Sequence, residues 1–154
     1  MTKIASEREF SLVKDSFSAV KKIDLKNIGF NQISDSNFYI YQSDYYKILN
    51  FTIKPELIFL IESEEDNIKV KLKSISIKNL PDIFKNIKIT LEVNIFHEKD
   101  LCKINRYITI KYESKNKFIK YLSENFIDKI LLNLIEIIST RFDKKFIKKI
   151  LKVI

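Results

Sequence analysis

The stretch FIDKILLNLIEIISTRFDKKFIKKILKVI, residues 126–154, decides the fold of this chain. It contains no Gly or Pro, and its apolar residues recur at intervals of three and four, the pattern of one face of an α-helix. The same period begins near Asn116, so the sequence predicts one long amphipathic helix. Such a helix, apolar on one side and basic on the other, can be a membrane anchor, a nucleic-acid-binding helix or a lid over another layer of the protein. Its apolar positions are Phe118, Leu122, Phe126, Ile130, Leu134, Ile137, Ile138, Phe142 and Phe146.

The middle of the chain shows the two-residue alternation of half-buried antiparallel strands. Residues 86–96, NIKITLEVNIF, alternate without a fault, whereas the apolar phase of NIKVKLKSISI, residues 67–77, shifts part-way. This phase shift predicts a β-bulge near Ser74 and a strongly curved sheet. Pro55 separates two apolar runs and predicts a break or bulge there. Further strand material lies at residues 38–41, 48–61 and 104–112, with short turns at 63–67 and 97–100.

The N-terminal part reads as a strand followed by a short helix. TKIASEREFSLV would place Phe10 and Leu12 inward, and Phe17 and Val20 are spaced for one helical face. Gly29 suits a helix stop. The sequence therefore predicts an α+β helix-grip fold. In this fold a curved antiparallel sheet of about six or seven strands is covered by a long C-terminal helix, with short N-terminal helices, in a single domain spanning residues 1–154.

Composition limits the class of protein. A chain of 154 residues with 45% hydrophobic and 31% charged residues is typical of one globular domain, and a single Gly and two Pro leave no linker. Cys102 is the only cysteine, which excludes an internal disulfide. The longest apolar run, residues 130–138, is far short of the roughly 20 residues of a membrane span. Because MTKIASEREFSL is also too charged for a signal peptide, we expect a cytoplasmic, soluble protein.

The net charge of +8 has two interpretations. A basic surface attracts phosphate backbones and anionic lipid headgroups. Alternatively, a chain rich in Ile, Lys, Asn and Phe and poor in Ala, Gly and Arg has the bias of AT-rich codons, and its lysines follow from that bias. We favour the compositional interpretation.

Three stretches resemble a family of uncharacterised function found in cyanobacteria and plastids. FYIYQSDYYKILNFTIKPELIFLIES (residues 38–63) is similar to the family's Ile-x-Pro motif, here Ile53, Lys54 and Pro55, and its flanking strands. NIKVKLKSISIKN (67–79) resembles the next strand, and NFIDKILLNLIEIISTRFDKKFIKKI (125–150) the closing helix. The resemblance covers roughly residues 28–150. It implies a START-like, SRPBCC-type helix-grip domain, the birch-pollen-allergen fold, and suggests a marine cyanobacterium with a small, AT-rich genome.

The sequence shows no catalytic constellation. One Gly cannot build a phosphate loop, and His97 with Cys102 is too small a set for a structural zinc site. We expect no cofactor, no metal and no enzymatic activity. His97 and Cys102 flank one hairpin turn, so a nucleophile pair is formally available, but we expect them near solvent and inactive. The acidic cluster at residues 62–66 is interpreted as a solvated turn.

Arg106 shares a strand face with apolar residues. Facing inward it would need a carboxylate or a ligand anion, and we favour the alternative that it lies at a strand end open to water. The inward rows and the helix nevertheless define the candidate walls of a cavity. These cavity-lining candidates are Ile89, Leu91, Val93, Arg106, Ile108, Ile110, Phe126, Ile130 and Leu134.

Two functions follow from these patterns. The first is a non-enzymatic binding or carrier module that holds an apolar ligand, such as a lipid, isoprenoid or pigment, between sheet and helix. The alternative is a basic-surface protein that docks on an anionic membrane, an acidic protein partner or RNA, of which nucleic acid is the least favoured. The sequence leaves the oligomeric state open. The basic-surface candidates are Arg141, Lys144, Lys145, Lys148, Lys149 and Lys152.

Overall fold

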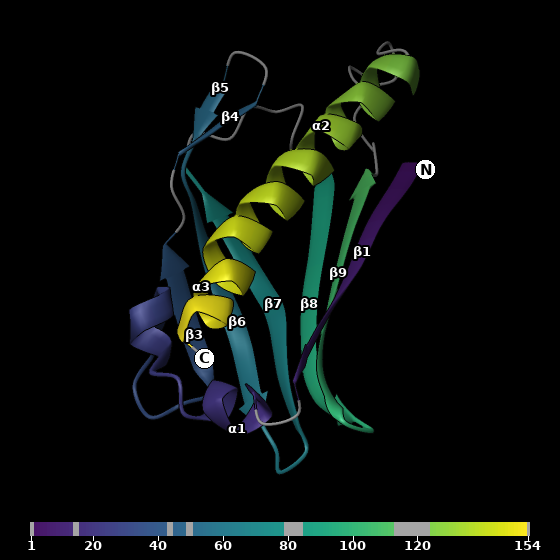
Figure 1. Cartoon of the computed structure of the whole chain (residues 1–154). Coiled ribbons are helices and arrows are strands. Elements are labelled where there is room, and N and C mark those ends of the chain that lie inside the picture. Colours follow the sequence, from purple (N-terminus) through teal and green to yellow (C-terminus); the bar gives the residue numbers. More distant parts are fainter. Residues whose placement is uncertain are drawn as a thin grey trace.

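A computed structural model describes residues 2–13, 16–42, 45–48, 51–78, 85–112 and 124–153. In these ranges a curved antiparallel sheet of seven strands lies against a long helix that crosses its concave face (Figure 1). The strand order is β1-β9-β8-β7-β6-β3-β2. This is the predicted helix-grip fold, with its helix packed as a lid on the sheet. The strands are β1 (Thr2–Val13), β2 (Phe30–Gln32), β3 (Phe38–Gln42), β6 (Pro55–Ser63), β7 (Asn67–Ile77), β8 (Ile87–Glu98) and β9 (Leu101–Tyr112).

Alternation of apolar and polar residues selects the concave face. In β8 the side chains of Leu91, Val93 and Ile95 are buried, while the intervening residues point to the other side. In β9 the row that pairs with them, including Ile104 and Ile108, is fully buried. The core therefore lies between the concave face of the sheet and the terminal helix.

Two irregularities predicted from sequence are present. Ile58 pairs with Ser74 and Phe59 with Leu72, which leaves Lys73 as the extra residue of a bulge between β6 and β7. The chain also breaks at Lys54, directly before Pro55. Before that break it forms a hairpin of β4 (Tyr46–Ile48) and β5 (Phe51–Ile53), a separate two-stranded sheet. Neither this hairpin nor β2 was expected as a separate element.

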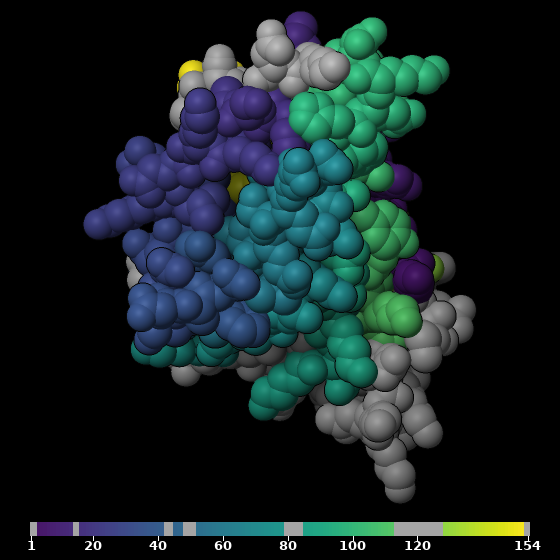
Figure 2. All heavy atoms as spheres, turned by 90° about the horizontal axis from the view of Figure 1, so that it is seen from below, coloured from purple at the N-terminus to yellow at the C-terminus, as the bar shows by residue number. Residues whose placement is uncertain are grey.

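Two short helices close one end of the space between sheet and helix. They are α1 (Ser16–Lys21) and the 3₁₀ turn η1 (Leu25–Ile28). Helix α1 buries Phe17 and Val20, the two residues that the sequence placed on one helical face, and η1 buries Ile28. Figure 2 views this end from below. Purple atoms of the N-terminal segment lie against teal atoms of the strands, and only a small area of the yellow terminal helix is visible between them.

The terminal helix consists of α2 (Glu124–Phe142), the π-helical turn η4 (Asp143–Ile147) and α3 (Lys148–Val153). The predicted start at residues 116–123 lies outside the described residues. Apolar residues recur at every fourth position, and on a helix of 3.6 residues per turn each step of four overshoots a full turn by about 40°. A π-turn accommodates one extra residue and rotates the following residues back by about 100°. As a result Phe146, Ile147 and Ile150 are buried on the sheet.

Gly29 ends η1 in the left-handed conformation, with φ of 99°, and its N–H donates to the carbonyl oxygens of Leu25 and Lys26. A Cβ at this position would lie 2.9 Å from Cε2 of the Tyr41 ring. We expect Gly29→Ala to lower the free energy of unfolding by at least about 1–2 kcal/mol, because an L-residue is strained there and the ring must move. Urea denaturation measures this loss. Asn27→Ala in the same turn is the control. The Asn27 side chain is exposed, so this substitution should change the free energy of unfolding by less than about 0.5 kcal/mol. Equal effects of the two substitutions would show that position 29 does not require a glycine.

Candidate apolar binding site

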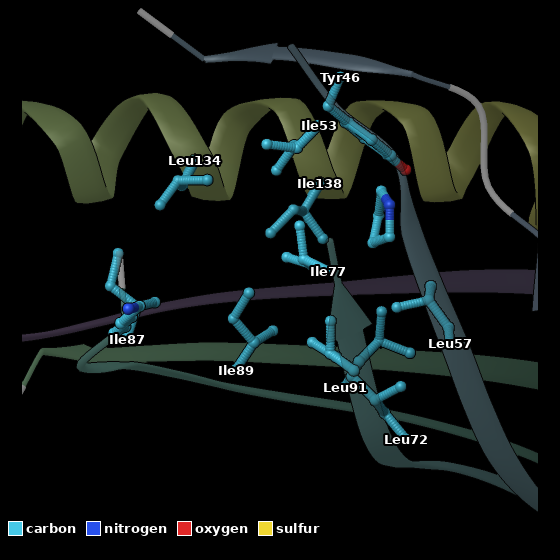
Figure 3. A pocket seen from close by; sticks show the side chains of 13 residues that line it. Tyr46, Ile53, Leu57, Leu72, Ile77, Ile87, Ile89, Leu91, Leu134 and Ile138 are labelled. Carbon is cyan, nitrogen blue, oxygen red and sulfur yellow. The ribbon is translucent and has the colours of Figure 1, made fainter. Parts of the chain in front are cut away.

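A cavity of about 260 Å³ lies between α2 and one end of the sheet (Figure 3). Leu134 and Ile138 of α2 form one wall, and Ile89 and Leu91 of β8 form part of the opposite wall. Tyr46 and Ile53 reach it from the β4–β5 hairpin. Its described lining is Tyr46, Ile53, Pro55, Leu57, Leu72, Ile75, Ile77, Lys85, Ile87, Ile89, Leu91, Leu134 and Ile138.

The cavity occupies the end of the sheet where side chains stop meeting the helix. Ile87 and Ile89 face inward in the same row as Val93 and Ile95, yet the first two are only half-buried and the last two are buried. An aliphatic side chain that points into the interior and keeps exposed surface indicates unfilled space beside it. Bulky Ile residues therefore fill the core at one end of the sheet and line a space at the other.

The bulge in β7 makes this wall apolar. Because Lys73 is an extra residue, Ile75 pairs with Leu57 and Ile77 with Pro55, and all four side chains line the cavity. Without the extra residue, the two-residue period would turn Ser74 and Ser76 inward instead. The phase shift seen in the sequence thus has a direct consequence for the site.

The β4–β5 hairpin covers the cavity from outside the main sheet. Its strands pair with each other, and Tyr46 lies under the Arg141 guanidinium of α2, 5.0 Å from the ring centroid. Burial and, secondarily, Tyr46 raise the pKa of Tyr41 to about 12, so Tyr41 stays protonated at neutral pH. The contact between Arg141 and Tyr46 joins the hairpin to the helix.

Three of the nine cavity candidates from the sequence line this cavity: Ile89, Leu91 and Leu134. Four others, Val93, Ile108, Ile110 and Ile130, are buried in the packed core, and of Phe126 the structure describes only the backbone. The alternation identified the inward face correctly but did not show where along it the helix and sheet separate. The hairpin residues and the apolar residues after the bulge were missed, although the break at Pro55 and the phase shift were signals for them.

Arg106 is the ninth candidate, and the favoured interpretation that it is open to water is wrong. It is only 2% exposed and forms a bidentate ion pair with Asp143, with Nε donating to Oδ1 at 2.9 Å and Nη2 to Oδ2 at 2.9 Å. Its Nη1 donates to Ser6 Oγ at 3.0 Å, and Arg8 Nη1 reaches Asp143 Oδ2 at 3.3 Å. The inward Arg has the carboxylate partner that burial requires. It lies in the core and does not line the cavity.

Cys102 is also misplaced by the sequence interpretation. It is fully buried, opposite His97 in the β8–β9 pairing, and burial raises the pKa of its thiol. The His97 ring instead packs on Phe17, with centroids 4.1 Å apart. A buried thiol with a raised pKa holds little of the reactive thiolate. The acidic turn at residues 62–66 is exposed, as predicted.

The basic-surface candidates lie along the end of the terminal helix. Lys144, Lys148, Lys149 and Lys152 are exposed, whereas Lys145 is half-buried and Arg141 covers Tyr46. Across the ranges that the structure covers, no cluster of three His, Cys, Asp or Glu could hold a metal. Nor does any helix in those ranges have the length and apolar character to cross a membrane.

Neither a family model nor a curated protein matches the sequence. Ara h 8.0201 is structurally similar, with 9% identity, a TM-score of 0.45 and coverage of 98% of this chain and 99% of that one. An uncharacterised protein of Bacillus thuringiensis has 11% identity and a TM-score of 0.45, with coverage of 96% of this chain and 99% of that one. A START superfamily protein of Mycobacterium smegmatis has 6% identity and a TM-score of 0.43, with coverage of 94% of this chain and 97% of that one.

Ara h 8.0201 and the Mycobacterium smegmatis protein have the helix-grip fold of the START and birch-pollen-allergen type. Identities of 6–11% and TM-scores of 0.43–0.45 describe a similarity of architecture and carry no information about function. The narrower cyanobacterial and plastid family receives no support from these comparisons.

The buried ion pair leads to a stability prediction. Arg106→Met leaves the Asp143 carboxylate buried with only Arg8, so we expect a loss of about 3–5 kcal/mol in the free energy of unfolding. The double variant Arg106→Met with Asp143→Leu removes both charges and should recover most of that loss. Urea denaturation with circular dichroism measures both variants.

The matched control for this pair is Lys71→Met. Lys71 pairs with Glu92 at 3.5 Å, but both side chains are more than half exposed. We expect a change of less than about 1 kcal/mol. If Arg106→Met costs no more than this control, the ion pair does not anchor the helix.

Proposed function

We propose that the protein is a non-enzymatic binding module that holds one small apolar molecule between the sheet and the terminal helix. The observation that carries this proposal is the cavity of about 260 Å³ with its aliphatic wall. Eleven of its thirteen described lining residues have purely apolar side chains. Transfer of an apolar molecule into such a space is favourable in proportion to the apolar surface removed from water.

The size of the cavity narrows the ligand. Pockets for drug-sized ligands measure roughly 300–1,000 Å³, so this cavity lies just below that range. Of lipids, isoprenoids and pigments, a short acyl or isoprenoid chain fits best. Tyr46 and Lys85 are the two lining residues with polar side chains. The described lining contains no His, Cys, Ser, Thr, Asp or Glu that could act with them as an acid, base or nucleophile. We place this binding function in the cytoplasm, consistent with a single buried free cysteine.

A neutral fluorescent dye, N-phenyl-1-naphthylamine, tests the cavity directly. We expect one molecule to bind per chain with increased fluorescence, and Ile89→Trp to weaken binding at least tenfold because the larger side chain fills the space. Ile58→Trp is the matched control, since Ile58 lies next to Phe59 on β6 and points to the opposite face. Absence of dye binding to the native protein, or equal effects of the two variants, would reject the proposed function.

A second candidate is docking of the helix end on an anionic membrane. Leu151 is 36% exposed among Lys148, Lys149 and Lys152, which is the composition of a membrane-surface helix. Each lysine near an anionic surface contributes about 1 kcal/mol.

Vesicle sedimentation tests this second candidate. We expect binding to phosphatidylglycerol vesicles that falls as salt rises, and Lys148→Glu with Lys152→Glu should reduce binding more than Lys69→Glu with Lys71→Glu on β7. Equal reductions would show that net charge alone acts. Binding to an acidic protein but not to vesicles would show that the partner is a protein and not a membrane.

A further inference from the structure

Strand β1 is a long edge of the sheet. It pairs with β9 over its whole length, from Thr2 opposite Tyr112 to Val13 opposite Leu101, without a shift in register. In Figure 1 it forms the border of the sheet beyond β9, and within the described ranges no strand lies on its other side. The backbone N–H and C=O groups of every second residue of such a strand point outward. The twelve residues of β1 therefore form a regular template for one more antiparallel strand.

The features that usually protect a sheet edge from pairing are weak on β1. The opposite edge strand, β2, has only three residues, whereas β1 is long and contains no Pro, Gly or bulge. A charge that points toward the core can also block an edge. Arg8 has that position, but its guanidinium binds Asp143 at 3.3 Å and lies over the Phe10 ring, 4.7 Å from the centroid. Because Arg8 is held by its own chain, a further strand can approach β1.

The charges of β1 make the strand complementary to a second copy of itself. Two copies of β1 that pair antiparallel are related by a two-fold axis, which makes the contacts of one copy identical to those of the other. With Ser6 on this axis, residues 2–10 pair, and Lys3 of each copy lies opposite Glu9 of the other. Both side chains are exposed, and cross-strand pairs of opposite charge stabilise a sheet. A carboxylate accepts several hydrogen bonds, so Glu9 can keep its ion pair with Lys103, at 3.2 Å, and accept a second.

Charge disfavours the neighbouring registers. An axis at Glu7 would place the two Glu7 carboxylates opposite each other, and an axis at Arg8 would oppose the two Arg8 side chains. Like charges directly opposite each other destabilise a pair of strands. An axis at Ala5 avoids like charges but pairs only residues 2–8. The register centred on Ser6 is thus the longest one that opposes no like charges.

We propose that the chain forms a symmetric dimer through β1, in which the two sheets join into one continuous sheet. This interface goes beyond the proposed binding function and does not depend on it. The two-fold axis through Ser6 is perpendicular to the sheet, so both concave faces lie on the same side. The described lining of the cavity includes no residue of β1, and each copy therefore keeps its cavity.

Sedimentation equilibrium from micromolar to millimolar concentration tests this interface. We expect the native protein to form a reversible dimer. Lys3→Glu and Glu9→Lys each place like charges opposite each other twice, and each should weaken dimerisation about tenfold. Lys69→Glu is the matched control, because it reverses an exposed charge on the outer face of β7, away from the edge. It should change the dimer dissociation constant by less than about twofold.

A mixture of the two variants provides the most specific result. One chain then carries only acidic side chains at positions 3 and 9 and the other only basic ones, so both cross-strand pairs have opposite charge again. We expect the equimolar mixture to dimerise within about threefold of the native protein, which also shows that both variants fold. A native protein that stays monomeric would overturn the proposal, even if its edge binds a strand of another protein. A dimer that neither reversal weakens, or a mixture without recovery, would overturn it as well.

Discussion

The fold depends on how the terminal helix keeps its apolar side on a curved sheet. Apolar residues at every fourth position would wind off the sheet on a regular α-helix, because each step of four overshoots a turn. The π-turn at Asp143–Ile147 returns Phe146 and Ile150 to the core. The same turn carries Asp143 to Arg106, where the bidentate ion pair fixes the helix to β9 and, through Ser6 and Arg8, to β1.

This constraint explains why the space between helix and sheet is filled at one end and empty at the other. Beside the ion pair the inward rows of β8 and β9 are buried, and α1 packs Phe17 into that end. Toward the other end the inward side chains of β8 become half-buried, and the β4–β5 hairpin crosses to the helix instead of pairing with the sheet. The cavity is closed by packed side chains at one end and covered at the other end by the β4–β5 hairpin. This arrangement suits binding of a small molecule. The hydrophobic effect provides the affinity there.

Much of this architecture could be predicted from the sequence because it is encoded by local periodicity. The alternation in β7 and β8, the bulge beside Ser74, the break at Pro55 and the short helices that end at Gly29 are all local patterns. The π-turn was missed, because the spacing of three and four between apolar residues was interpreted as an ordinary helix.

The rest depends on contacts between segments far apart in the chain. Arg106 was expected in water because its partner, Asp143, lies 37 residues away on another element. The cavity candidates were chosen along the whole inward face, and only the three-dimensional divergence of helix and sheet shows that Ile89 lines a space while Ile108 is packed. Tyr46 and Ile53 were missed because a three-residue strand gives too short a pattern to place across a cavity.

The most direct measurement is a crystal structure of the ligand-free protein under xenon pressure, because xenon binds in dry apolar cavities. We expect an anomalous peak in the space bounded by Ile77, Ile89 and Leu134, beneath a continuous helix held by the Arg106–Asp143 pair. A site without xenon and filled by side chains, or a terminal helix that leaves the concave face, would contradict the account.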